Sequence, residues 1–210
     1  TQQGQIKRFE RKELSPWRTY RSKSTKYAKL KDQDDCIVAV APVVLEDIMI
    51  ITKNGYGLRF NIEEVPVVGA KAAGVKAINL KDGDQVAAAF KSTTPSMYIL
   101  TQRGSLKRML QDDIPVTSRA KRGLQVLREL KNKPHRVFKA GPVFTDQGDF
   151  DLFTSQEEVA EQDQILQITS TTGQVTEVDL TQLSISERTS NGSFVNDTIS
   201  DQEVFSATIK

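Results

Sequence analysis

Two kinds of hydrophobic pattern alternate along the chain. Residues 48–51 and 97–100 form continuous apolar runs, which are typical of strands buried on both faces. The segment after the first run alternates, with apolar Leu58, Phe60 and Ile62, which is typical of a half-buried strand. Helical periodicity is weak throughout. The pattern therefore predicts an all-β protein made of short strands.

This strand pattern is repeated. Residues 48–60 read IMIITKNGYGLRF, residues 97–109 read MYILTQRGSLKRM, and the chain opens in the same phase with TQQGQIKRF. A fainter copy at residues 166–178 reads LQITSTTGQVTEV, with one extra residue before its glycine. Because internal repeats of this length are the signature of repeat architectures, they decide the fold before any local motif does.

Two glycines mark each repeat. The turn glycines are Gly4, Gly55, Gly104 and Gly173, so the first two intervals are nearly equal and the third is longer, as an insertion would make it. A second glycine follows each of the later turn glycines at one constant distance. These second glycines are Gly74, Gly123 and Gly192.

Each repeat has the strand content of a propeller blade, about four strands in about 50 residues. We predict one all-β, propeller-like domain over residues 1–210. Its repeats span approximately 1–46, 47–95, 96–143 and 144–210, the last with an acidic insertion at 144–163. A β-sandwich would explain neither the regular interval between turn glycines nor the constant position of the second glycine.

The charges are strongly segregated, although the chain as a whole has a net charge of only +2. Residues 1–143 carry 27 Lys and Arg against 14 Asp and Glu, a net of +13, whereas residues 144–210 have a net of −11. Such asymmetry favours a partner of high negative charge density for the first three repeats, with nucleic acid as the leading class.

Basic residues recur at two places in the repeat, directly after the turn glycine and just before the second glycine. Repetition should place them along one edge of the domain, where they match a phosphate backbone. No zinc finger or recognition helix is apparent, so we expect sequence-tolerant binding of double-stranded DNA, coupled to bending. The candidate DNA-binding residues are Lys7, Arg8, Arg18, Arg21, Lys23, Arg59, Lys71, Lys76, Arg103, Lys107, Arg108, Arg119, Lys121 and Arg122.

No catalytic or metal-binding constellation is apparent. The single His135 has no Cys partner at ligand spacing, and we expect it in a solvated loop. The single Cys36 lies in an apolar stretch and is expected to be a core thiol in a reducing cytoplasm. No apolar run is long enough to span a membrane, and no signal peptide is expected at the polar start of the chain.

The repeat unit Thr-x-x-Gly-x-x-Lys-Arg, followed by Arg/Lys-x-x-Gly, resembles the C-terminal domain of the A subunits of bacterial type IIA topoisomerases. Residues 61–77, 117–137 and 186–194 look like the topoisomerase IV A subunit, ParC, of Gram-positive bacteria. The gyrase A subunit carries a Q-R-R-G-G-x-G box, which does not occur here. This difference favours topoisomerase IV over gyrase.

The resemblance implies a β-pinwheel, a propeller-like disc of five or six blades whose basic rim bends the DNA segment to be transported. It also implies a heterotetramer with ParE that uses ATP and Mg²⁺ for decatenation and supercoil relaxation on the bacterial nucleoid. The catalytic residues belong to other domains of that family, so this chain should be non-catalytic.

Two other functions remain open on the residues alone. One is a propeller scaffold for protein partners, with the basic edge as a solvated face. The other is a chromatin-binding, nucleotide-exchange propeller of the regulator-of-chromosome-condensation kind, whose repeats are of similar length. The Lys-Arg pairs and the charge segregation favour DNA.

Overall fold

The computed structural model describes residues 1–14, 27–43, 45–81, 83–144, 164–195 and 203–210, and these form β-strands and three short 3-10 helices. Within these ranges no helix is long and apolar enough to cross a membrane. The strands are β1 (Gln5–Ile6), β2 (Asp47–Thr52), β3 (Tyr56–Asn61), β4 (Val75–Lys76), β5 (Val86–Lys91), β6 (Ser96–Thr101), β7 (Ser105–Leu110), β8 (Leu124–Gln125), β9 (Val137–Val143), β10 (Ile165–Ser170), β11 (Val175–Asp179), β12 (Ser193–Phe194) and β13 (Val204–Ile209). The 3-10 helices are η1 (Arg11–Glu13), η2 (Ile62–Glu64) and η3 (Gln111–Asp113).

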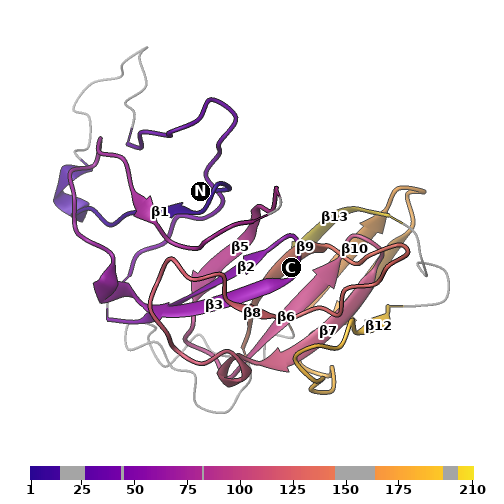
Figure 1. The fold of residues 1–210 in the computed structure, drawn as a ribbon. Helices are drawn as coiled ribbons and strands as arrows, with labels where there is room; N and C mark the ends of the chain where they lie inside the picture. Colours follow the sequence, from indigo (N-terminus) through magenta and orange to yellow (C-terminus); the bar gives the residue numbers. More distant parts are fainter. Residues whose placement is uncertain (15–26, 44, 82, 145–163, 196–202) are drawn as a thin grey trace, which may run out of the picture.

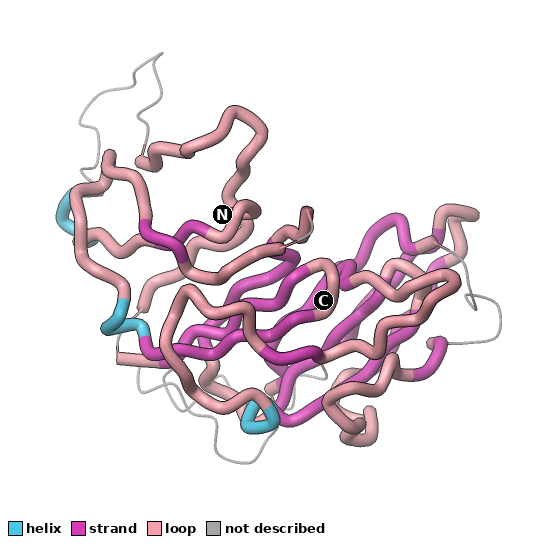
Figure 2. The backbone as a smooth tube through the Cα atoms, in the orientation of Figure 1, coloured by secondary structure: helices cyan, strands magenta, loops and turns pink. Residues whose placement is uncertain are grey.

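Four antiparallel sheets lie in a row that follows the order of the repeats (Figure 1). The strand orders are β1-β4, β5-β2-β3-β8, β9-β6-β7-β12 and β13-β10-β11, here called sheets 1 to 4. Loops on the outside of the row connect the sheets (Figure 2). The all-β, propeller-like fold expected from the repeats is confirmed, and the described sheets form an open row rather than a closed ring.

Each of the first three sheets takes its last strand from the following repeat. In sheet 2, β8 of the third repeat pairs with β3 of the second, and in sheet 3, β12 of the fourth repeat pairs with β7 of the third. In sheet 1, β4 of the second repeat pairs with β1. The sequence repeats and the spatial sheets are therefore out of step by one strand, which the repeat pattern did not reveal.

The second glycine of each repeat allows this exchange. A Cβ at that position would collide with a main-chain carbonyl oxygen of the preceding repeat, two residues after its turn glycine. Only glycine lets two backbones approach so closely. The contacts are Gly74 with Ile6, Gly123 with Gly57, and Gly192 with Leu106.

The turn before each second strand has one construction in all four repeats. The glycine at its end has a positive φ, 80° at Gly55 and 77° at Gly104. The hydroxyl of the preceding Thr accepts a hydrogen bond from the amide directly after that glycine, as in Thr52 Oγ1 with Tyr56 N at 3.1 Å. Ser170 takes this role in the fourth repeat, so that turn has no extra residue, contrary to the match expected from the sequence.

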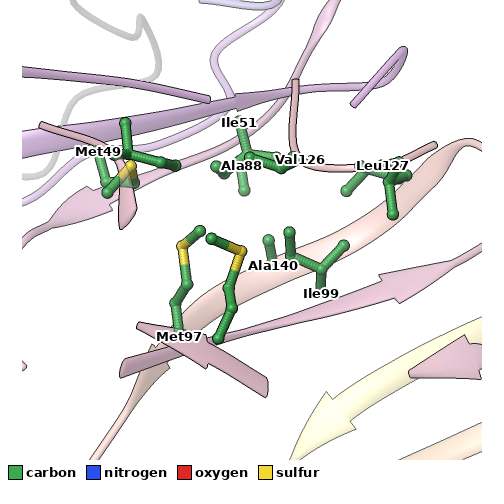
Figure 3. Packing of buried hydrophobic residues seen from close by; sticks show 11 residues of the cluster. Met49, Ile51, Ala88, Met97, Ile99, Val126, Leu127 and Ala140 are labelled. Carbon is green, nitrogen blue, oxygen red and sulfur yellow. The ribbon is translucent and has the colours of Figure 1, made fainter. Parts of the chain in front are cut away.

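The core consists of contacts between neighbouring sheets, which explains the continuous apolar runs. Along β2, Ile48 and Ile50 pack toward sheet 1, while Met49 and Ile51 pack toward sheet 3. Figure 3 shows the second of these interfaces, where Met49 and Ile51 face Met97, Ile99 and Ala140 of sheet 3. A strand that is buried on both faces is apolar at successive positions, so its sequence does not alternate between apolar and polar residues.

The expectation that Cys36 is a core thiol is wrong. Residues 37–41 correspond to β5 of the second repeat: Asp35 Oδ1 accepts a hydrogen bond from Cys36 N, as Asp84 Oδ1 does from Gln85 N. In the first repeat this segment is not a strand, and Cys36 is exposed. A strand corresponding to β2, with which it would pair, is not among the described residues.

The close approach of the second glycine can be tested by comparison with a turn glycine of equal φ. Gly123 and Gly173 both have a φ of 84°, but a Cβ on Gly173 would meet nothing within 4 Å. We expect Gly173→Ala to lower the free energy of unfolding by about 1–2 kcal/mol through backbone strain. Gly123→Ala should cost roughly 2 kcal/mol more, because β8 must move away from β3. Urea denaturation measures both, and equal losses would contradict the role assigned to the contact.

Candidate nucleic-acid interface

Three loops build the outer edge of the row of sheets. Each leaves the core, passes the strand of the preceding repeat, turns, and returns as that sheet's last strand. We call residues 65–76, 114–125 and 183–194 the rim loops of repeats 2, 3 and 4, and the edge they form the rim. Most of the predicted DNA-binding residues lie in these loops or beneath them.

The lysine of the Lys-Arg pair points into the next rim loop rather than into solvent. Lys107 is only 2% exposed. Its Nζ donates to the carbonyl oxygens of Val126 at 2.6 Å, Arg188 at 2.6 Å and Ser190 at 2.9 Å. This ammonium is not available to a phosphate on the surface. The burial of Lys107 therefore argues against its predicted role in DNA binding.

Lys7 has the same arrangement at the first junction, between repeats 1 and 2. Its Nζ donates to the carbonyl oxygens of Tyr27 at 2.7 Å, Ala72 at 3.1 Å and Ala70. Ala70 and Ala72 stand four and two positions before the second glycine, as Arg188 and Ser190 do. Both lysines therefore fasten a rim loop to the sheet that it completes.

Burial affects the protonation of these two lysines. The pKa of Lys107 is lowered to about 7, mainly by burial and to a smaller extent by the nearby Arg188 guanidinium, while Asp113 opposes the change. Burial also lowers the pKa of Lys7, with Glu13 opposing. An ammonium taken out of water loses hydration that carbonyl dipoles only partly replace.

The second junction lacks the lysine and uses the backbone instead. Leu58 occupies the matching position and is fully buried. There the rim loop of repeat 3 bonds directly to repeat 2, from Ala120 N to Ala77 O at 2.6 Å and from Asn79 N to Lys121 O at 2.9 Å. Ala120 adopts a φ of 63° to make this contact. The lysine is thus one of two ways to hold a rim loop.

The arginine of the pair also has protein partners. Arg8 Nε donates to Val65 O at 2.7 Å, and the Arg108 guanidinium donates to Ser96 Oγ and Thr181 O. Arg59 forms ion pairs with Asp47 at 3.2 Å and Asp112 at 2.7 Å. All three arginines bind a residue at or just before the start of the next rim loop. These partners make phosphate contacts at the three positions less favourable than the sequence predicted.

Arg119 serves as a tie between adjacent rim loops. Its guanidinium donates to Glu64 O at 3.0 Å and to Lys76 O at 2.8 Å. Arg188 takes the same position in repeat 4, where it donates to Gln125 O at 2.5 Å. The two arginines are equivalent, although only Arg119 was predicted to bind DNA.

Four predicted cations remain exposed on the rim, namely Lys71, Lys76, Lys121 and Arg122. Three of them gather where the rim loops of repeats 2 and 3 meet. Lys76 Nζ donates to Asn79 Oδ1, and the backbone amide of Asn79 donates to the carbonyl oxygen of Lys121. The Arg122 guanidinium lies 4.3 Å from the ring centroid of Tyr56. The structure thus brings together cations that belong to two different repeats.

Arg103 and His135 lie together, away from this cluster. His135 is 6% exposed, so its expected place in a solvated loop is wrong. The Arg103 guanidinium contacts His135 Nε2 at 3.1 Å, and Thr101 Oγ1 lies 3.1 Å from Nδ1. Since arginine only donates, Nε2 accepts and Nδ1 carries the proton. His135 follows its turn glycine at the same interval as the buried Asp35 follows Gly4, and this equivalence could have revealed the burial.

Arg128 is an exposed cation that sequence reasoning missed. It lies beside an open hollow of about 390 Å³ between the third repeat and the rim loop of repeat 4, lined by Arg128, Leu130, Ser186, Glu187, Ser190 and Asn191. Arg18, Arg21 and Lys23, together with the acidic insertion from residue 145 to 163, fall outside the described residues. Among those described, no three His, Cys, Asp or Glu side chains gather as metal ligands.

The fold and the rim define a class of protein: a repeat-built, propeller-like domain in which a sheet is completed by the next repeat. The chain belongs to the DNA gyrase C-terminal domain, beta-propeller, family, whose model matches residues 1–43, 46–93 and 96–143. The resemblance stated from the sequence is therefore confirmed.

The similar proteins are topoisomerase subunits. The chain is 63% identical over 209 residues to the A subunit of DNA topoisomerase 4 from Streptococcus pyogenes serotype M3, covering 99% of this chain and 26% of that protein. It is 63% identical over 207 residues to the same subunit of Streptococcus pneumoniae serotype 4, covering 99% and 25%. The chain thus spans about a quarter of the length of these relatives.

Two solved structures of C-terminal domains have a fold similar to that of this chain. The crystal structure of the C-terminal domain of DNA topoisomerase IV matches with a TM-score of 0.81 at 32% identity, covering 99% of this chain and 59% of that one. The DNA gyrase A C-terminal domain matches with a TM-score of 0.71 at 18% identity, covering 99% and 63%, which is a likeness of fold.

The buried Lys107 predicts a pH-dependent stability that can be measured. Lys107→Leu introduces the residue that repeat 2 already has. The folded pKa of about 7 lies below the ordinary 10.5. Between these values the unfolded chain holds the proton that the folded chain has lost, so raising the pH favours folding. The parent chain should therefore gain stability over the variant from pH 7 to about 10, by up to roughly 1 kcal/mol per pH unit.

Urea denaturation of both proteins between pH 6 and pH 9.5 measures this difference. Lys71→Leu, which removes an exposed lysine of the rim, controls for the loss of one charge. A difference that stays constant across the range would show that Lys107 keeps its proton in the folded state.

Proposed function

We propose that this chain is the non-catalytic, DNA-binding and DNA-bending part of a type IIA topoisomerase A subunit of the topoisomerase IV kind. It presents the DNA segment that is transported during decatenation and supercoil relaxation. The observation that carries this proposal is the exposed cation cluster on the rim, in a chain 63% identical to the A subunit of DNA topoisomerase 4. Lys76, Lys121 and Arg122 belong to it, with Lys71 farther along the same rim.

The rim is suited to the DNA backbone rather than to base edges. The exposed cations stand on loops at the edges of successive sheets, and the described residues contain no helix that could enter a major groove. Phosphate contacts position a duplex without reading its sequence, and their strength depends on salt. A curved edge that holds phosphates at several places favours a bent duplex.

The relatives extend well beyond the region that this chain matches. We propose that the rest of the ParC subunit holds the residues that cleave DNA, and that it assembles with ParE into a heterotetramer. That assembly would use ATP and Mg²⁺ outside this chain, in the cytoplasm and at the nucleoid. The isolated chain should neither cleave nor religate DNA.

The salt dependence of binding tests the phosphate contacts. Lys7 and Lys107 are not counted among the phosphate contacts, because they bind carbonyl oxygens of the chain. With the basic residues outside the described ranges included, we expect about four to six phosphates to be neutralised. The plot of log K against log salt on duplex DNA should then have a slope of roughly −4 to −5. Fluorescence anisotropy with several unrelated duplexes measures slope and sequence dependence. A flat salt response would instead favour the protein-scaffold function.

Charge reversal at the rim tests which cations contribute. Lys121→Glu with Arg122→Glu should weaken binding to all sequences alike and reduce the magnitude of the slope by about two units. Lys29→Glu with Lys31→Glu makes the same charge change at positions outside the rim loops and should have a smaller effect. Equal effects would mean that net charge, and not the rim, governs binding.

A further inference from the structure

One aliphatic side chain is exposed at the same position of every rim loop. Val67 is 54% exposed, Val116 is 51% exposed and Ile185 is 48% exposed. Each stands two residues after a side chain that packs in the core, namely Val65, Ile114 and Leu183. A polar residue would be tolerated at such a position, because the side chain is not needed by the core.

The three side chains lie at the outermost backbone of the sheets. Val67, Val116 and Ile185 form parallel bridges with Arg8, Arg59 and Arg108 of the preceding repeats. Aliphatic residues on an exposed sheet edge carry a risk of aggregation that proteins commonly avoid by placing charges there. Their recurrence at one position in three repeats is a pattern that contact with a partner would explain.

The rim loops of repeats 2 and 3 also carry the exposed cations, whereas the rim loop of repeat 4 carries none. Val67 precedes Lys71 by four residues, and Val116 precedes Lys121 by five. In the rim loop of repeat 3, the basic turn is flanked on its other side by Leu124, which is also exposed. Cationic and aliphatic groups thus alternate along the rim loops of repeats 2 and 3, and the aliphatic series continues with Ile185 in the rim loop of repeat 4.

The spacing of these groups indicates the kind of partner. A protein partner generally covers one contiguous apolar patch with a polar border. Here single aliphatic groups are distributed over three loops, each in line with the rim. An extended ligand that offers both negative charge and apolar edges at regular intervals fits this distribution, and the sugar–phosphate backbone of DNA has both.

We propose that Val67, Val116 and Ile185 pack against the deoxyribose groups of the bound duplex, whose phosphates are held by the exposed cations of the rim loops of repeats 2 and 3. This inference rests on the proposed function and adds an apolar component to it. Apolar side chains inserted between base steps in the minor groove are a known way of stabilising bent DNA, so protein–DNA interfaces use apolar contacts as well as charges. The contact should add affinity that does not depend on salt.

The test replaces the three side chains with Thr, which keeps the β-branch and introduces a hydroxyl. The Val67→Thr, Val116→Thr, Ile185→Thr variant should bind a fluorescein-labelled duplex of about 40 base pairs roughly 10-fold more weakly, as expected for losing a few buried methyl groups. The salt slope should be unchanged, whereas the charge reversal of Lys121 and Arg122 changes it. Val116→Thr alone should weaken binding about 2-fold and serves if the triple variant is unstable.

Val40→Thr is the matched control. Val40 is 84% exposed and lies in the segment that corresponds to β5, away from the rim. Unchanged affinity of the triple variant, with normal binding by the parent chain, would overturn the apolar contact and leave the proposed function intact. Absence of DNA binding by the parent would overturn the proposed function itself. If sedimentation shows that the parent self-associates and the triple variant does not, with equal DNA affinity, the side chains serve a second copy of the chain instead.

Discussion

The exchange of rim loops between repeats is the constraint on which this structure depends. Each of the first three sheets is incomplete until a two-residue strand of the following repeat lies on its edge, and one glycine per repeat makes room for that strand. A side chain at Gly123 or Gly192 would push the donated backbone away. The order of the sheets, the cores between them and the rim all follow from this contact, since a repeat with no neighbour has neither a full sheet nor a full core.

The basic residues fall into two physical groups because of this exchange. Where a long side chain lies under a rim loop, its ammonium or guanidinium meets carbonyl oxygens at the close distances seen for Lys107 and Arg188. A lysine has three donors, which suits a loop that presents three carbonyls. Cations at the turn itself, such as Lys121, are exposed, and the Lys121 ammonium donates to a hydroxyl of its own loop, Thr117 Oγ1. Position in the loop, rather than residue type, separates structural cations from those available to a ligand.

Parts of the candidate site were predictable and parts were not. The repeat register placed Lys121 and Arg122 correctly before the second glycine, where they are exposed. The same reasoning grouped them with Arg119, whose side chain ties two loops together. It also placed Lys107 on the surface, because a lysine beside an arginine in a strand is usually solvated. Nothing local distinguishes these residues, since the carbonyls that bind them come from another repeat.

The sequence by itself determined the all-β class, the number of repeats it contains and the construction of the turns. These depend on neighbours in the chain: a Thr hydroxyl, a glycine with positive φ, and apolar runs suited to burial on both faces. Only the tertiary structure decided which repeat completes which sheet and which cations are buried. It also decided that His135 is buried and Cys36 exposed. Those outcomes depend on contacts between residues far apart in sequence, where one backbone carbonyl changes the environment of a side chain.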